Sequence, residues 1–182
     1  KKHLMNELFE KKNLPFYKFG DAIYLAKIET KYWIEYICKR FENTGKHISP
    51  ELAEEICRLV DNHSSYVQQL SWLLWIRTIN TATTEQLSYA LEDLLDQNNI
   101  LFQSETENLS AYQMNFLKAI VDGIHTKFSS KEVISKYNLG TSANIVRLKN
   151  ALLQKELIET NGKEIVLADP VFGVWFKKEM LY

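Results

Sequence analysis

The last third of the chain carries local signals in an order that few folds can accommodate. Ser110-x-x-Gln113 and Ser129-x-x-Glu132 match the capping-box pattern, and each predicts the start of a helix. The first helix is expected to end near Asp122 and the second, which is short, near Tyr137. Asn138-Leu139-Gly140 then predicts a tight turn, after which Thr141 begins a third helix with one apolar face formed by Ile145, Leu148 and Leu152.

The segments that follow this third helix predict a hairpin and a closing helix. Residues 157–160 and 164–167 flank Asn161-Gly162, which is the preferred two-residue turn of a β-hairpin. Asp169-Pro170 predicts the start of a last helix that carries Phe172, Trp175 and Phe176. Three helices, the second short and joined to the third by a tight turn, followed by a hairpin, predict a winged helix-turn-helix domain.

Residues 30–100 predict a bundle of helices, so the fold class is mainly α. Thr30, Ser49 and the Thr83-x-x-Gln86 capping box mark helix starts, and a polar break at residues 61–65 separates two further helices. The polar stretch 103–108 is expected to be a linker between the bundle and the winged helix. The apolar faces of the bundle are Trp33, Ile34, Ile37, Cys38 and Phe41; Leu52, Ile56, Leu59 and Val60; Tyr66, Leu70, Leu73 and Leu74; and Leu87, Leu91, Leu94 and Leu95.

The first 29 residues differ from the rest of the chain. Pro15 interrupts any helix that begins near Leu4, and residues 23–28 alternate as a strand that is apolar on both faces except at Lys27. Such a strand needs a sheet, and the sequence offers no obvious partner for it. Since the chain also does not begin with Met, we expect it to be a piece of a longer protein.

Spacing excludes several kinds of site from this chain. The six glycines lie more than ten residues apart, so neither G-x-x-x-x-G-K-[ST] nor G-x-G-x-x-G can be written. The four histidines form no H-x-x-x-H pair, and Cys38 and Cys57 lie 19 residues apart, so no local metal site is expected. Cys57 falls in a helix and is interpreted as a small buried hydrophobe rather than a nucleophile. No complete catalytic site follows, and whether the chain is part of an enzyme stays open.

Composition indicates the cellular compartment of the protein, and the distribution of charge bears on whether it binds DNA or another protein. Two cysteines, no signal peptide and no long apolar run together favour a cytoplasmic protein. From Ser110 onward there are 10 basic and 7 acidic side chains, a net charge of +3, whereas the preceding part has 12 basic and 16 acidic ones. Arg147, Asn150 and Lys163 are therefore candidate contacts to DNA. Only Arg147 is charged on the outer face of the third helix, so docking of a protein partner is favoured over DNA binding.

A helical bundle followed by a winged helix resembles the C-terminal part of P-loop ATPases of the AAA+/STAND superfamily, which are common in bacteria and archaea. Residues 1–5 resemble the segment that leaves the sensor-1 strand, and residues 14–18 resemble the turn after it, with Lys18 where Arg is expected. The resemblance implies three parts: 1–29 as a remnant of the ATPase core, 30–109 as a helical lid, and 110–182 as the winged helix. It also implies that the core domain is the partner of this chain, and that ATP and Mg²⁺ bind in the parent protein rather than in this fragment.

Residues 62–70 are similar to the lid motif of that superfamily, in which a Gly/His-Pro step opens a helix beside the nucleotide phosphates. His63 and Ser64 are the residues to which the resemblance assigns nucleotide sensing, although Ser64 stands where Pro is usual. A helix N-terminus suits an anion, because its free N–H groups and its dipole are positive. The alternative is that His63 lies in a polar loop and only caps the helix.

Two functions follow from these patterns. The first is the C-terminal regulatory portion of an ATPase, in which the lid couples nucleotide state to a winged helix that docks a partner. The second is a DNA-binding transcriptional regulator with a helical sensing or dimerisation domain. In that case Trp33, Trp72 and Trp75 would line a ligand pocket or a dimer seam.

Overall fold

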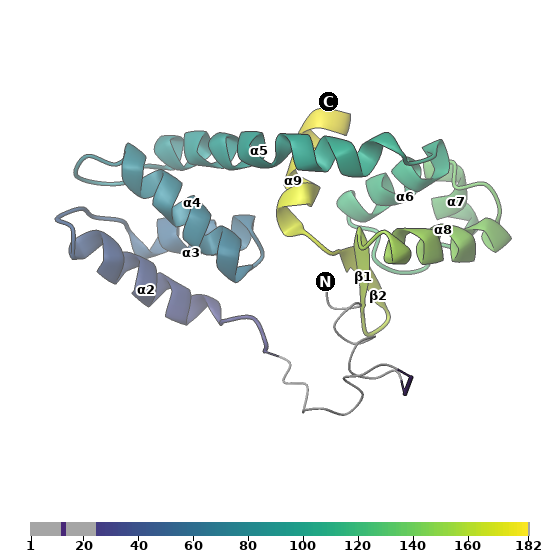
Figure 1. Ribbon diagram of the computed structural model, residues 1–182, viewed down its shortest axis with the longest axis horizontal. Coiled ribbons are helices and arrows are strands. Elements are labelled where there is room, and N and C mark those ends of the chain that lie inside the picture. Colours follow the sequence, from purple (N-terminus) through teal and green to yellow (C-terminus); the bar gives the residue numbers. More distant parts are fainter. Residues whose placement is uncertain (1–11, 14–24, 182) are drawn as a thin grey trace.

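One long helix spans both halves of the molecule. The computed structural model describes residues 12–13 and 25–181 and is mainly helical, as predicted. Figure 1 shows α5 running along one side, with α2, α3 and α4 against one end and the winged helix against the other. The elements of the first half are α2 (Thr30–Glu42), α3 (Pro50–Leu59), α4 (Ser64–Arg77) and α5 (Thr84–Glu107). Those of the second half are α6 (Ala111–Val121), α7 (Lys131–Tyr137), α8 (Ser142–Gln154), β1 (Ile158–Asn161), β2 (Glu164–Leu167) and α9 (Pro170–Leu181).

Polar side chains determine where several helices begin. The Ser49 hydroxyl accepts from the backbone N–H of Leu52, and Pro50 occupies the first helical position of α3, where a missing N–H costs nothing. Both halves of the capping box are formed at Thr83–Gln86 for α5 and at Ser110–Gln113 for α6. At α2 the N-cap is Glu29, so Thr30 is the first helical residue rather than the cap.

The predicted apolar faces form one continuous core. Trp33, Ile37 and Phe41 of α2 are buried, as are Val67 and Leu70 of α4. In the winged helix the rings of Phe116 and Phe128 stack with their centroids 4.5 Å apart. Burial of these side chains is the main stabilising contribution to both halves.

The winged helix is present with two local differences from the prediction. Helix α7 begins one residue later, because the hydroxyl of Ser130, not Ser129, accepts from the N–H of Val133. The tight turn after α7 places Asn138 (φ 49°) and Gly140 (φ 84°) in the left-handed region. In the hairpin Asn161 pairs with Glu164, so the two turn residues are Gly162 and Lys163 rather than Asn161 and Gly162.

Two predicted segments have a different structure. Residues 25–28 form no strand, and Leu25 is 90% exposed, while Ile23 and Tyr24 lie outside the described residues, as do the segments 1–5 and 14–18. The polar stretch 103–108 is the last turn of α5 up to Glu107, not a linker. Phe102 and Thr106 are buried one turn apart on the inner face of this segment, which explains why the helix continues through polar residues.

The two halves meet where α5 packs against α9. The ring of Phe102 lies 5.4 Å from that of Phe172 and 5.6 Å from that of Trp175, and the indole N–H of Trp175 donates to Asn99 at 2.8 Å. The described part of the chain contains no helix with the length and apolarity needed to cross a bilayer.

Candidate functional site

The turn between α3 and α4 has an unusual backbone. Asp61 (φ 48°) and Asn62 (φ 53°) are consecutive left-handed residues, a conformation that Asp and Asn adopt more readily than other non-glycine residues. The N–H of Asn62 donates to Cys57 O and that of His63 to Val60 O, each at 2.9 Å. These bonds end α3 and direct the chain straight into α4.

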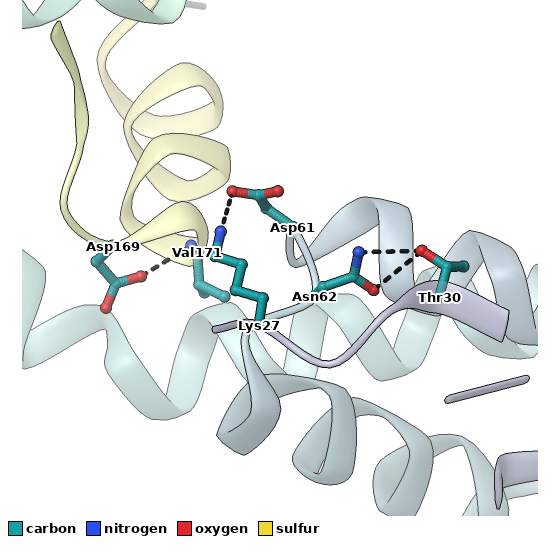
Figure 2. A network of polar contacts seen from close by, with 6 residues as sticks. All are labelled: Lys27, Thr30, Asp61, Asn62, Asp169 and Val171. Carbon is teal, nitrogen blue, oxygen red and sulfur yellow. Dashed lines mark hydrogen bonds and ion pairs between the residues drawn. The ribbon is translucent and has the colours of Figure 1, made fainter. Parts of the chain in front are cut away.

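The same turn holds the segment that enters α2 (Figure 2). The ammonium of Lys27 pairs with Asp61 at 2.5 Å, and the side-chain amide of Asn62 exchanges contacts of 3.0 and 3.3 Å with the Thr30 hydroxyl. The ion pair is exposed, so it contributes little to stability. Its effect is to bring Lys27 and the start of α2 to the turn that precedes His63.

His63 and Ser64 lie at the start of α4, where the sequence places them. His63 is the N-cap residue by position, but its exposed side chain accepts no capping hydrogen bond. The first turn of α4 contains no acidic residue, so no carboxylate of that turn neutralises the positive end of the helix dipole. The imidazole ring is instead tilted against the ring of Tyr66, with the centroids 4.7 Å apart.

Tyr66 connects this helix start to the winged helix. Its hydroxyl donates to Asp169 Oδ2 at 2.6 Å, across 103 residues of sequence. The other carboxylate oxygen, Asp169 Oδ1, accepts from the N–H groups of Val171 (2.8 Å, drawn in Figure 2) and Phe172 (3.0 Å), and so caps α9. Burial, followed by the hydrogen bond to Asp169, raises the pKa of Tyr66 above its usual value, so the hydroxyl stays protonated and donates.

The candidate DNA contacts are exposed, and two of the three share one face of α8. Arg147 and Asn150 lie on the outer face of α8, as the helical period predicts, and Lys163 lies at the tip of the hairpin beside Glu164. Within the described residues no hydrogen bond or ion pair joins these three side chains. Val146 on the same face of α8 is 61% exposed, so this face is partly apolar.

The cysteines have the environment of core residues. Cys57 is fully buried, and burial raises the pKa of its thiol to about 11, so it is not a nucleophile at neutral pH. Burial also raises the pKa of Cys38. No group of three or more His, Cys, Asp or Glu side chains in the described ranges is placed to hold a metal ion.

One feature was not found from the sequence, and a second was found only in part. The Tyr66–Asp169 bond has no local signal, because its partners lie in different halves. The second feature is an aromatic groove between α2 and α4, lined in part by Tyr36, Trp72 and Trp75. Its signal was the spacing of the tryptophans, but Trp33, the third of them, is buried in the core and does not line the groove.

Comparison with known proteins supports the fold of both halves. Residues 100–178 match the family described as "Probable winged helix domain". No curated protein matches the chain in sequence. The structure is similar to the Walker-type ATPase Paby2304 of Pyrococcus abyssi, with a TM-score of 0.68 and 17% identity, over 97% of this chain and 49% of that one. The chain therefore carries a winged-helix domain in a fold that also occurs in a Walker-type ATPase about twice as long.

Proposed function

We propose that this chain is the C-terminal regulatory portion of an ATP-binding P-loop ATPase of the AAA+/STAND kind. In this proposal a nucleotide-binding domain precedes Lys1, residues 30–109 form the lid, and the winged helix docks a partner. Support comes from the fold shared with a Walker-type ATPase, of which this chain spans 49%. ATP and Mg²⁺ would be bound chiefly by that preceding domain, since this chain contains no phosphate-binding loop.

The observation that carries the proposal is the hydrogen bond from Tyr66 to Asp169. It joins the first turn of α4, where His63 and Ser64 lie, to the cap of the last helix of the winged helix. The Asp169 carboxylate accepts hydrogen bonds from Tyr66 and from the first N–H groups of α9, so a movement of Tyr66 would disturb the cap of α9. A ligand can shift a conformational equilibrium only through a contact that differs between the two states. The start of α4 can provide such a contact.

The chemistry of the α4 start suits a phosphate group. His63 is exposed, no carboxylate lies in the first helical turn, and the free N–H groups point out of the helix end. Movement of the imidazole toward an anion would change its 4.7 Å contact with the Tyr66 ring. The alternative, a loop residue that only caps the helix, is weakened because the His63 side chain makes no capping bond.

The test is His63→Ala in the complete ATPase, with ATP affinity and turnover as measurements. We expect weaker ATP binding or an altered turnover rate, because His63 is one of the two residues proposed to sense the nucleotide. His47→Ala is the matched control: His47 is also exposed, and its backbone forms an isolated bridge with Thr81. ATP binding and turnover that stay unchanged in His63→Ala would overturn the sensing assignment.

A second candidate, a DNA-binding regulator, is favoured by one observation, the exposure of Arg147 and Asn150 on α8. The exposed Val146 on that face and the presence of a single cation there argue for a protein partner instead. A gel-shift experiment at two salt concentrations separates these functions. Specific, salt-sensitive binding of a duplex that Arg147→Ala abolishes would favour the regulator.

A further inference from the structure

A groove of about 520 Å³ lies between α2 and α4. Tyr36 and Arg40 of α2 line one side, Trp72 and Trp75 of α4 line the other, and the buried Phe41 lies between them. Its volume falls in the range of roughly 300–1,000 Å³ in which binding sites for small ligands and single side chains are found.

Large aromatic side chains remain exposed along this groove. Trp72 is 57% exposed and Tyr36 is 41% exposed. Tyr32 and Ile76, one helical turn away on the same two helices, are exposed as well and extend the apolar surface beyond the groove. Exposed apolar surface that continues over several side chains is typical of interaction sites, and Trp and Tyr carry much of the binding energy at them.

The charged side chains at the groove are cations: Arg40 lines it, and Lys46 lies beside it, over the ring of the lining residue Trp75. The Arg40 guanidinium lies 5.2 Å from the centroid of the Tyr36 ring, and the Lys46 ammonium lies 4.0 Å from that of the Trp75 ring. Lys46 also donates to the backbone carbonyl of Trp75 at 2.7 Å, so two of its three N–H groups can still donate to a ligand. Within the described part of the chain no acidic side chain lines the groove, and neither cation forms an ion pair with a carboxylate.

We propose that this groove binds a short acidic segment of a partner protein. An apolar side chain of the segment inserts between Tyr36 and Trp72, and carboxylates on either side of it bind Arg40 and Lys46. The aromatic walls provide the apolar contact, and the two cations provide charge-assisted hydrogen bonds, which are stronger than neutral ones. This inference uses neither His63 nor Ser64, and it does not depend on nucleotide sensing.

A single-stranded nucleic acid also combines negative charge with flat apolar groups, but the groove fits it less well. Base stacking needs open ring faces. Here Arg40 covers one face of the Tyr36 ring, and Lys46 covers one face of the Trp75 ring. Nucleic-acid binding also depends on several phosphate contacts. At this groove the described cations are Arg40 and, beside Trp75, Lys46.

Fluorescence anisotropy of a dye-labelled, end-blocked peptide of alternating aspartate and leucine, titrated with the full chain, tests the proposal. We expect saturable binding that the unlabelled peptide competes away. The analogue with lysine in place of aspartate, and the one with serine in place of leucine, are expected not to bind. A labelled oligothymidine strand tests the nucleic-acid alternative in the same assay.

Substitutions of groove residues test whether the peptide binds in the groove itself. Trp72→Ala and Arg40→Gln are each expected to weaken peptide binding by at least about tenfold, since each removes a central contact. The matched controls Tyr89→Ala and Arg58→Gln change an exposed aromatic and an exposed arginine elsewhere and are expected to bind normally. Circular dichroism confirms that all four are folded.

Three results would overturn the proposal: no binding of the acidic peptide, equal binding of the lysine analogue, or binding that Trp72→Ala leaves intact. Binding of oligothymidine that Trp72→Ala abolishes, without peptide binding, would assign the groove to single-stranded nucleic acid instead.

Discussion

Tyr66 shows how one side chain can join two parts of a chain that are far apart in sequence. A buried tyrosine hydroxyl loses its water, and it needs a partner if the loss is not to cost stability. Not every buried polar atom in this molecule finds one, because Trp33 Nε1 and Tyr137 Oη have no hydrogen-bond partner among the described residues. The period of α4 predicts that Tyr66 points inward, but no pattern in the sequence predicts Asp169 as its acceptor.

Tyr66→Phe removes only the hydroxyl and therefore isolates this bond. We expect the free energy of unfolding at pH 7 to fall by about 1–3 kcal/mol, because the bond is lost and a carboxylate oxygen loses its donor. Urea denaturation followed by circular dichroism measures the change. Tyr137→Phe is the matched control, and it should be neutral or slightly stabilising because its hydroxyl has no partner within the described residues. Equal losses in the two variants would contradict a specific role for the Tyr66 bond.

The raised pKa of Tyr66 also predicts a dependence on pH. In the unfolded chain the tyrosine loses its proton near pH 10, whereas in the folded chain it keeps it to higher pH. The contribution of the neutral hydroxyl is therefore fully present below about pH 10 and is lost as the pH rises further. Unfolding measured between pH 9 and 11 should show a steeper loss of stability in the wild type than in Tyr66→Phe. Parallel curves would mean that the pKa is not raised.

At the scale of the elements, capping side chains predicted helix starts to within a residue, because a cap acts through hydrogen bonds to its own helix. The start of α7 and the register of the hairpin were predicted wrongly, because in each case two neighbouring positions fit the same sequence pattern. Ser129 and Ser130 can each cap a helix, and in the structure the hydroxyl of Ser130 does so. Hairpin registers that differ by two residues place the same side chains, such as Ile165, on the buried face, so alternation cannot distinguish them. Gly162, with φ of 60°, then suits the first turn position.

The last turns of α5 offer a direct test of the helix that replaces the expected linker. Ser104 is exposed in this segment, so its side chain contributes little to packing. Ser104→Pro should lower the free energy of unfolding by about 3 kcal/mol, because proline removes a helical hydrogen bond and clashes with the preceding turn. Ser104→Ala should be neutral or slightly stabilising. If the proline variant were as stable as the alanine variant in urea denaturation, residues 103–107 would not be helical.

At the scale of the whole molecule, the sequence predicted the kinds of element better than their assembly. The helical bundle and the winged helix follow from period and capping, which are local. The packing of α5 on α9 and the groove between α2 and α4 depend on contacts between distant segments, which local patterns do not specify. The division at residues 29 and 109, the sensing role of His63 and Ser64, and the DNA contacts of Arg147, Asn150 and Lys163 stay predictions.

The contact between α5 and α9 predicts that both halves unfold together. Phe102→Ala leaves a cavity beside Phe172 and Trp175 and should lower the free energy of unfolding by about 3–5 kcal/mol. The neighbouring Leu101→Ala, at a 53% exposed position, is the control and should change it by less than about 1 kcal/mol. Tryptophan fluorescence and circular dichroism should report one coincident transition in the wild type. Two separate transitions would show that the halves are independent.

The length of α5 gives it the properties of a lever. With 24 residues it is about 36 Å long, so tilting the helix by about 10° about its first turn displaces its last turn by about 6 Å. That displacement is comparable to a full turn of helix. A continuous helix in this position can therefore convert a change too small to rearrange one domain into a movement large enough to expose or bury a surface on the next.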